Sequence, residues 1–399
     1  MRILIAHNAY QQRGGEDAVV AAEAQVLEAN GHTVVRYQRH NDELLSRSPL
    51  CSIITGIETV WAARAVREVT TLIAREKPDV VHFHNTFPLI SPAAYYACEK
   101  AGVPVVQTLH NYRLLCPAAT FFRDGTICEE CLGRTVPWPG VVHGCYRNST
   151  LASGAVAVML TVHRAMRTWQ TKVNAYIALS EFARRKLIEG GLPAERIAVK
   201  PNFVSVDPKR KSDPGTYALF VGRLSEEKGL RVLLEAWVRL GIPVPLRIAG
   251  DGPMREEIAR LLQEKKRERV ELLGPVAHAE IIALMRGARF LLFPSIWYEG
   301  FPLAIVEAFA CGLPVIASRL GAMAEIITDG QVGLHFSVGD STDLARKVQW
   351  AWTHPQKMEE MGRAAHTRFE QKYTAERGYE NLMSIYRQAL ERTSRHAES

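Results

Sequence analysis

The sequence predicts an α/β protein built from two domains of the doubly wound, parallel-sheet type (Rossmann-like). Short apolar strands alternate with helical patterns along the whole chain, and the strands are rich in Val, Ile and Leu. They lack a strict alternation of apolar and polar residues, so we expect both of their faces to be buried. Helices between such strands give parallel sheets, which bind ligands at the carboxyl ends of the strands.

Twelve strands are expected, six in each half of the chain. Those of the first half are residues 2–7, 33–38, 79–84, 103–110, 175–180 and 197–202. Those of the second half are residues 217–222, 244–250, 270–275, 290–295, 314–318 and 332–337. The same alternation with helices in both halves implies two domains of similar construction.

The polar segment 201–215 is rich in Pro, Lys and Asp, which predicts a linker between the domains. We therefore expect an N-terminal domain over 1–205 and a C-terminal domain over 206–370. The remaining stretch, 371–399, is charged and helical in pattern. We expect it to pack back on the N-terminal domain.

The composition is that of an ordinary soluble globular protein, with 47% hydrophobic and 23% charged residues. No apolar run reaches the roughly 18 residues that a membrane span needs. The best candidate, residues 154–162, is too short. The first residues form a strand instead of a basic region followed by a long apolar one, so we expect no signal peptide and a cytoplasmic protein.

The chain is basic, with a formal net charge of +7 and a pI of about 9.0. A nucleic-acid-binding protein would concentrate its basic residues in a stripe with aromatic side chains. Here they are spread along the chain, so no nucleic-acid partner is expected. The functional alternative is a general attraction to anionic substrates or to an anionic membrane, with peripheral contact at the cytoplasmic membrane face.

The most informative motif is EGFPLAIVE at 299–307, which follows an apolar strand and opens a helix. Gly300 frees the turn, and Pro302 suits the first helical turn, where its missing N–H would be unpaired anyway. Glu299 then lies in the loop, and Glu307 lies about one turn inside the helix. Free N–H groups at a helix start attract phosphate, and carboxylates bind sugar hydroxyls, so the motif predicts a nucleotide-sugar site.

Two other strand-to-helix turns carry candidate ligand-binding residues. Gly14 and Gly15 follow the first strand, where glycine lets a ligand approach the backbone, although a plain turn explains them equally well. Arg223 and Lys228 follow the first strand of the second domain. Two cations five residues apart across such a turn can hold a pyrophosphate, and surface charges are the alternative.

The remaining candidates also lie at strand ends. Gly250 and Asp251 form a turn that is either ligand-facing or structural. His110 ends a strand, where functional residues collect, although a lone histidine is more often structural. His82 and His84 share one face of their strand, and no metal role is expected because no partner acid or third ligand is evident.

Four cysteines, Cys116, Cys128, Cys131 and Cys145, lie in a loop-rich insert over about 114–150. A CxxC flanked on both sides by a cysteine about a dozen residues away resembles a Cys₄ zinc ribbon or knuckle. Such an insert cannot build a core of its own, and a structural zinc would stabilise it. Free thiols, a disulfide and an iron–sulfur centre stay open, with a disulfide disfavoured in the cytosol.

The ordered motifs RGG, GRLSEEKG, AGDGP, LLGPV, PSIWYEGFPLAIVEAFACGLPVIAS and DG-x-x-G at 329–333 resemble glycosyltransferase family 4. The resemblance covers nearly the whole chain and is strongest over 217–340. It implies the GT-B fold, in which two Rossmann-like domains face a central cleft. It also implies a retaining reaction, with the first half of the chain binding the acceptor.

The resemblance implies roles for the candidates of the second half. Glu307 would hold the ribose hydroxyls, while Arg223 and Lys228 would clamp the pyrophosphate. Glu299 would meet the donor sugar and distal phosphate together with the backbone of Gly300, Phe301, Pro302 and Leu303. Pro275 and Val276 would lie beside the nucleotide base.

In the first half, Gly14 and Gly15 would close over the phosphates, and His110 would face the transferred sugar near the acceptor. The chain contains no D-x-D pair, so no catalytic divalent metal is expected. Arg223, Lys228 and the helix start would then stabilise the departing diphosphate. No carboxylate nucleophile is evident for a double displacement, and the family favours a front-face route in which the leaving phosphate helps to deprotonate the acceptor.

We therefore expect a metal-independent retaining hexosyltransferase that uses a UDP- or GDP-sugar. Its acceptor would be a glycan, soluble or lipid-linked, in the synthesis of cell-surface polysaccharide or glycolipid. A GT-B-shaped nucleotide-sugar epimerase and a non-catalytic regulatory homologue are the alternatives. The retained glutamates and both cations argue against a decayed site. The base, the sugar, the acceptor linkage and the oligomeric state stay open.

Overall fold

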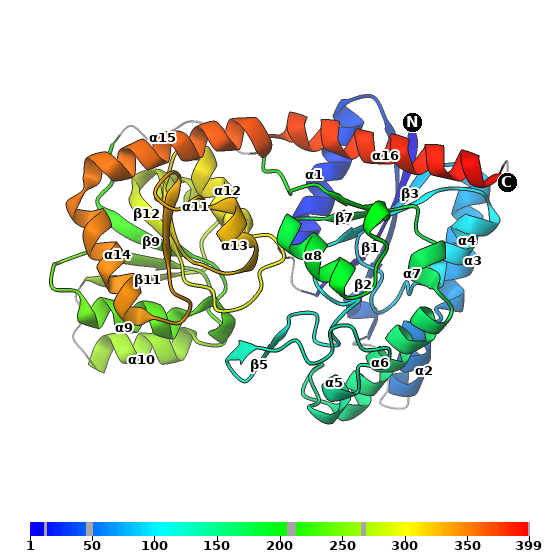
Figure 1. Ribbon diagram of the computed structural model, residues 1–399, viewed down its shortest axis with the longest axis horizontal. Coiled ribbons are helices and arrows are strands. Elements are labelled where there is room, and N and C mark those ends of the chain that lie inside the picture. The colour runs from blue at the N-terminus through cyan, green and yellow to red at the C-terminus, as the bar shows by residue number, and fades with distance from the viewer. Residues whose placement is uncertain (12–13, 45–50, 206–212, 265–268, 398–399) are drawn as a thin grey trace. The chain divides into compact units, whose positions relative to one another are not determined.

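The structure is a computed structural model (Figure 1), and it describes residues 1–11, 14–44, 51–205, 213–264 and 269–397. Part of the expected linker, 201–215, therefore lies outside the described residues. The chain divides into two compact units. The first unit comprises residues 1–121, 128–202 and 375–399, and the second comprises residues 122–127 and 203–374. Among the described residues, no helix combines the length and the apolar character that a membrane span requires.

The first unit contains a six-stranded parallel sheet with the order β2-β1-β3-β4-β7-β8. The strands are β1 (Arg2–Ala9), β2 (Thr33–His40), β3 (Val80–Phe83), β4 (Val105–Leu109), β7 (Ala175–Ala178) and β8 (Ile197–Val199). Because the chain runs from β1 to β2 and then returns to β3, the strand order reverses between β1 and β3. Ligands bind at such a switch point in open α/β sheets.

The helices of the first unit lie on the faces of this sheet and in the cysteine-rich insert. They are α1 (Gly15–Ala29), α2 (Cys51–Val60), α3 (Ala63–Glu76), α4 (Ala94–Lys100), α5 (Trp138–Val142), α6 (Thr150–Ala165), α7 (Thr168–Thr171), α8 (Glu181–Glu189) and α16 (Ala375–Ala397). The last of these, α16, packs against α1, β4 and β7 (Figure 1). Its Tyr386 is fully buried, so the end of the chain completes the core of this unit.

The second unit contains a six-stranded parallel sheet with the order β11-β10-β9-β12-β13-β14. Its strands are β9 (Tyr217–Val221), β10 (Leu246–Ala249), β11 (Val270–Gly274), β12 (Ala288–Phe293), β13 (Val315–Ser318) and β14 (Gly333–Phe336). Its helices are α9 (Leu230–Arg239), α10 (Arg255–Glu264), α11 (His278–Gly287), α12 (Leu303–Ala310), α13 (Gly321–Ile326), α14 (Ser341–Thr353) and α15 (Pro355–Lys372). This is the Rossmann strand order, with the switch point between β9 and β12.

The strands of the second unit are buried on both faces, as their composition predicts. Leu219 and Leu291 belong to one hydrophobic cluster, on the side of α11 and α12. Phe220 and Leu292, one residue further on, belong to the other, on the side of α9 and α14. Neighbouring residues therefore pack on opposite faces, which explains the apolar runs without alternation.

All twelve expected strands are present, and the prediction of two parallel-sheet α/β domains is confirmed. The cysteine-rich insert also contains a short antiparallel hairpin that was not predicted, formed by β5 (Phe122–Arg123) and β6 (Thr126–Ile127). Strands of two residues are too short to show a periodic pattern.

Candidate active site

The switch point of the second unit brings Lys228 and Glu299 together. The Lys228 ammonium donates a hydrogen bond of 2.7 Å to Oε1 of Glu299. The carboxylate also accepts one from the Ser295 hydroxyl, and Glu299 is only 6% exposed. The Nζ atom of Lys228 lies 5.3 Å from the centre of the Trp297 ring, which adds a cation–π contact. This arrangement holds a cation and a carboxylate in fixed positions at the carboxyl ends of β9 and β12.

Gly229 explains why the two loops approach so closely. Its φ of +70° lies in the left-handed region, and a Cβ there would meet the Pro294 carbonyl oxygen at 1.9 Å. The backbone N–H of Ile296 also donates to the Glu227 carbonyl oxygen at 2.9 Å. Any side chain at Gly229 would push the loops apart and separate Lys228 from Glu299.

The second predicted cation, Arg223, is exposed in the turn after β9. No carboxylate lies within ion-pair distance of it in the part of the chain that the structure describes. Lys228 therefore differs from Arg223, because its charge is already opposed by a buried carboxylate. The two cations lie in one loop, but only Arg223 has its full charge available for an anion.

The other end of the nonapeptide brings Glu307 to the loop after β11. Oε1 of Glu307 is 2.8 Å from Nε2 of His278, the first residue of α11. Pro275 and Val276 lie in the same loop, between β11 and α11. His278 was not singled out from the sequence, although it follows the LLGPV motif by two residues. Glu307 thus lies beside the segment that was predicted to meet the nucleotide base.

The start of α12 differs by one residue from the prediction. Pro302 is the N-cap residue, with extended backbone (φ −81°, ψ 91°), and the helix begins at Leu303. Pro302 therefore precedes the first helical turn instead of occupying it. No side chain caps this helix start, and a ligand or water is needed to accept from its free N–H groups. That is the chemistry a phosphate provides.

Gly250 has a structural reason to be glycine. Its φ is +142°, and a Cβ there would meet the Gly222 carbonyl oxygen at 1.9 Å. The loops after β9 and β10 therefore contact each other directly through their backbones. Asp251 is exposed and lies 3.6 Å from the Arg255 guanidinium, so its side chain is on the surface of that turn.

In the first unit, α1 begins at the switch point after β1, as predicted. The helix starts at Gly15, and Gly14 is its N-cap residue, whose N–H donates to the Asp17 carboxylate at 2.8 Å. A Cβ at Gly14 would meet nothing closer than that carboxylate, at 4.0 Å. Among the described residues, packing therefore does not require glycine at this position, in contrast to Gly229.

Sequence reasoning missed a group of polar side chains around this helix start. The Tyr10 hydroxyl donates to the Glu16 carboxylate at 3.1 Å, and His7 Nε2 lies 2.8 Å from Asp17 Oδ1. Burial raises the pKa of Glu16 to about 8, even though Tyr10 and Arg113 favour its charged form. The signal was two consecutive acids directly after the glycine pair, in GGED.

Glu16 should make stability depend on pH. Its pKa is raised from 4.5 to about 8 in the folded state, so the folded chain keeps a proton that the unfolded chain releases as the pH rises through this window. Stability should therefore fall between pH 5 and pH 8.5. In Glu16→Gln, Tm should fall less between these two pH values than it does in wild type. The difference should be roughly 2–4 °C for each kcal/mol of unfolding free energy that no longer depends on pH. Calorimetry of both proteins at both pH values measures it. An equal fall in wild type and variant would contradict the raised pKa.

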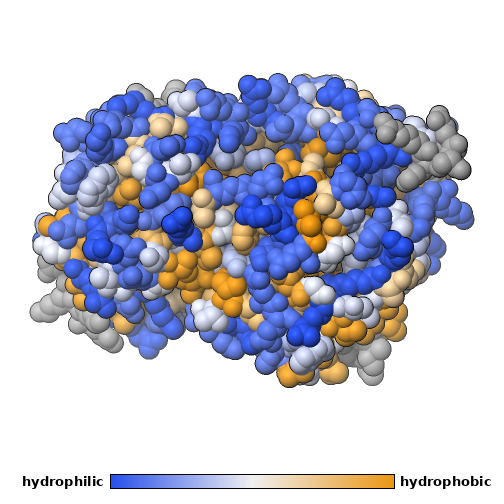
Figure 2. Space-filling view, viewed as in Figure 1, coloured by the Kyte–Doolittle hydropathy of each residue, from blue (hydrophilic) through white to orange (hydrophobic). Residues whose placement is uncertain are grey.

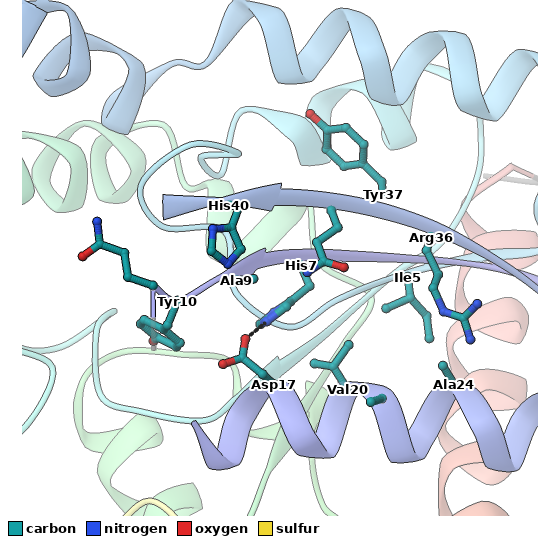
Figure 3. A pocket seen from close by; sticks show the side chains of 13 residues that line it. Ile5, His7, Ala9, Tyr10, Asp17, Val20, Ala24, Arg36, Tyr37 and His40 are labelled. Atoms are coloured by element: carbon teal, nitrogen blue, oxygen red, sulfur yellow. Dashed lines mark hydrogen bonds and ion pairs between the residues drawn. The ribbon is translucent and has the colours of Figure 1, made fainter. Parts of the chain in front are cut away.

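A pocket of about 380 Å³ opens between α1 and the strands β1 and β2 (Figure 3). His7, Asp17 and Tyr10 lie towards one end of it, and Arg36 lies at the other. Ile5, Val20 and Ala24 give it apolar walls. The mixture of aromatic, apolar and hydrogen-bonding groups is typical of a small-molecule site.

A chain of buried polar side chains reaches His110 from the interior. Nδ1 of His84 lies 3.0 Å from Nε2 of His110, and Nε2 of His84 lies 3.5 Å from a carboxylate oxygen of Glu23. The ammonium of Lys200 donates to the other oxygen of Glu23 at 2.6 Å. His84, His110 and Lys200 each follow the carboxyl end of a strand, which is β3, β4 and β8 respectively, and Glu23 lies on α1.

The Glu23 carboxylate favours one tautomer of His84 and, through it, of His110. Burial lowers the pKa of His110 to about 3 and that of His84 well below its usual value, so both rings are neutral. A proton on His84 Nε2 faces the Glu23 carboxylate, and His84 Nδ1 then accepts from His110 Nε2. Nδ1 of His110 is left as a hydrogen-bond acceptor.

The sequence showed no acid partner for His82 and His84, and the structure supplies one. Ligand atoms of Glu23, His82 and His84 lie within 4.8 Å of one another. However, His82 already bonds Tyr386 and Thr108 at 2.8 Å each. The Lys200 ammonium on Glu23 would also repel a cation. The group is better explained as a hydrogen-bond network than as a metal site.

The four cysteines of the insert lie near one another. Burial, together with the charges of Cys116, Cys145 and Cys128, raises the pKa of Cys131 to about 11. Four neighbouring thiols are a suitable donor set for zinc. Their sulfur atoms do not form a group within 4.8 Å of one another among the described residues, so a bound metal would have to draw them together.

Comparison with known proteins identifies the family. Residues 13–208 match the model described as Glycosyltransferase Family 4, and residues 205–368 match the one described as Glycosyl transferases group 1. D-inositol 3-phosphate glycosyltransferase of Pseudarthrobacter chlorophenolicus is 32% identical over 306 residues, covering 73% of this chain and 68% of that protein. The chain belongs to glycosyltransferase family 4. The enzyme class predicted from the sequence, a glycosyltransferase, is confirmed at this level.

Another relative of this family 4 glycosyltransferase is phosphatidyl-myo-inositol mannosyltransferase of Mycobacterium leprae. It is 36% identical over 217 residues, which are 52% of this chain and 56% of that protein. The family 4 chain thus spans little more than half the length of this relative. Among solved structures, Anabaena HepE in complex with UDP has a TM-score of 0.67 at 19% identity, over 99% of this chain and 100% of that one. This likeness confirms the GT-B fold.

Proposed function

We propose that the protein is a retaining hexosyltransferase that takes its sugar from a UDP- or GDP-sugar. The observation that carries the proposal is the fixed Lys228–Glu299 pair beside the uncapped start of α12, at the switch point between β9 and β12. Cleavage of the sugar–phosphate bond places negative charge on the leaving diphosphate. Preorganised cations and helix N–H groups stabilise such charge.

Each donor-site residue has a role in this proposal. Arg223 and Lys228 bind the pyrophosphate, and the N–H groups at the start of α12 bind the distal phosphate. Glu299 orients Lys228 and meets a hydroxyl of the donor sugar. Glu307, bonded to His278, holds the ribose hydroxyls, and the loop of Pro275 and Val276 lies against the base.

The first unit would hold the acceptor. The pocket between α1 and β2 offers hydrogen-bonding groups from His7, Gln38 and His40 beside apolar walls, as a glycan acceptor requires. Nδ1 of His110 would accept a hydrogen bond from a hydroxyl of the transferred sugar. Gly14 and Gly15 leave space for a phosphate beside the start of α1. A lipid-linked glycan is the acceptor class we favour, with the protein in the cytoplasm at the membrane face.

A thermal-shift titration with UDP, GDP, UDP-sugars and GDP-sugars tests the proposal. A ligand at a hundred times its Kd stabilises the protein by about 2.7 kcal/mol. A thermal shift with only one nucleotide class identifies the base. Glu307→Ala should reduce that shift. No shift with any of them would contradict the proposed donor. Identification of the product then distinguishes sugar transfer from epimerisation. If wild type turns over the donor and Glu299→Ala does not, the site is catalytic.

Activity should not depend on a divalent metal. The chain has no D-x-D pair, and Arg223, Lys228 and the α12 start supply the counter-charge for the diphosphate. Donor turnover measured with excess EDTA should therefore stay within about twofold of the untreated rate, a difference of less than about 0.5 kcal/mol in barrier. An absolute requirement for Mg²⁺ or Mn²⁺ would contradict this prediction.

The cysteine-rich insert should bind one structural zinc through Cys116, Cys128, Cys131 and Cys145. Elemental analysis of protein purified without chelator should show about one zinc per chain. Cys128→Ser should lower both the zinc content and the Tm, since metal binding contributes to folding. Cys311→Ser, a buried cysteine of the second unit, is the control and should leave the zinc content unchanged. Absence of zinc from the wild-type protein would contradict the predicted zinc site.

A further inference from the structure

Exposed apolar side chains are concentrated on one part of the first unit. Exposure is highest for twelve large apolar side chains among the residues that the structure describes; nine of them lie between residues 54 and 166, and the other three lie in the second unit. Figure 2 shows orange, hydrophobic surface at the lower right, in the region where α5 and α6 are labelled in Figure 1. Apolar surface gathered in this way marks an interaction site.

The exposed residues lie on adjoining helices. On α6, Leu151 (87% exposed) and Val158 are seven residues apart and therefore share one side of the helix. The helix α2 packs against α6 through Gly56 and exposes Ile57 (62%) beside that contact. The short helix α5 also contacts α6 and exposes Val142 (64%). Together with Trp138 at the start of α5, these side chains form what we call the α2–α5–α6 face.

The same part of the chain is free of acids and carries several arginines. Residues 131–180 contain five Lys and Arg and no Asp or Glu. Arg134, Arg147 and Arg167 are exposed, and within the described ranges none of them has an ion-pair partner. The Arg134 guanidinium lies 5.3 Å from the centre of the Trp138 ring. At the border, Glu58 lies on α2, and Glu130 lies 3.5 Å from the His143 ring.

We propose that the α2–α5–α6 face docks on an anionic phospholipid bilayer. Helices that lie in the membrane interface combine an apolar side with arginine, and tryptophan favours the headgroup level. Leu151, Val158 and Val142 enter the boundary between headgroups and acyl chains, while the arginines contact lipid phosphates. A second copy of the chain suits this face poorly, because an isologous contact would bring the unpaired arginines of both copies together.

Vesicle binding tests the proposal without donor or acceptor, so its outcome does not depend on the proposed sugar chemistry. The full chain is sedimented with vesicles of phosphatidylcholine alone and with vesicles that also contain the anionic lipid phosphatidylglycerol. Binding is expected only to the anionic vesicles and should weaken as salt is raised. Arg147→Gln/Arg167→Gln should bind roughly thirtyfold more weakly, since each cation near an anionic surface contributes about a factor of five.

Leu151→Ser/Val158→Ser should weaken binding at both low and high salt, because it removes apolar contact without changing charge. Val238→Ser/Val338→Ser, which removes exposed apolar side chains of the second unit, is the matched control and should bind as wild type does. Equal unfolding curves for all variants exclude misfolding as the cause. Failure of wild type to bind anionic vesicles would overturn the proposal, and so would a wild-type dimer that Leu151→Ser/Val158→Ser dissociates.

Discussion

Lys228→Ala is expected to lower donor turnover by about 10²–10³-fold, the usual effect of removing one preorganised group that stabilises developing negative charge. The effect should appear mainly in kcat, because the charge on the leaving diphosphate grows towards the transition state. Stopped assays of nucleotide diphosphate release measure it directly. The variant also leaves Glu299 buried without its ammonium, and that unpaired carboxylate repels the diphosphate.

Two further variants separate these causes. Lys228→Ala/Glu299→Gln removes both charges, and a partial recovery relative to Lys228→Ala measures the repulsion by Glu299. Arg231→Ala is the matched control, because Arg231 lies three residues away, is exposed and pairs with Glu257 at 3.1 Å. It should change turnover by less than threefold. A Lys228→Ala enzyme as active as this control would remove Lys228 from the proposed site.

The second large effect concerns the buried Glu23–Lys200 pair, in which both side chains are fully buried and 2.6 Å apart. Lys200→Met should destabilise the first unit by about 3–5 kcal/mol, because it leaves a buried carboxylate uncompensated. Glu23→Gln/Lys200→Met should lose much less, since the charges are removed together. Hydrogen exchange of α1 and β8 measures these differences within the first unit, which need not unfold together with the second.

An exposed pair gives the control for this prediction. Lys357 and Glu360 lie 2.8 Å apart on α15 with both side chains exposed, and Lys357→Met should change stability by less than about 1 kcal/mol. The buried pair should also respond to acid. Despite the burial of Glu23, the Lys200 ammonium holds the pKa of this carboxyl below 4.5, so its contribution is complete above that pH and is lost as the pH falls further. Similar losses from Lys200→Met and Lys357→Met would contradict the cost of an unpaired buried charge.

The sequence predicted the strands and the loops that carry the proposed donor site, for a physical reason. Strands buried on both faces of a parallel sheet read as apolar runs, and the loops that follow them meet at one edge of the sheet. Lys228 and Glu299 could therefore be assigned to neighbouring loops. Their direct contact could not be predicted, because it depends on β12 pairing with β9 and on the approach that Gly229 permits.

The buried polar network of the first unit could not be predicted from the sequence. Glu23 lies in the middle of α1, where an acid normally faces solvent. Its partner Lys200 is 177 residues further along the chain, and neither residue lies in a motif. His82 and His84 were placed on one face, but the acid beside them comes from α1, and the sequence pattern did not define how this helix is rotated about its axis.

The position of α16 has a consequence for how the protein is made. The Tyr386 hydroxyl that bonds His82 belongs to a helix that is synthesised after the whole second unit. The first unit therefore begins to be translated before the second unit and is completed after it. Until α16 is synthesised, the core of the first unit lacks Tyr386. A nascent chain stalled before this residue would expose an incomplete core to chaperones and proteases.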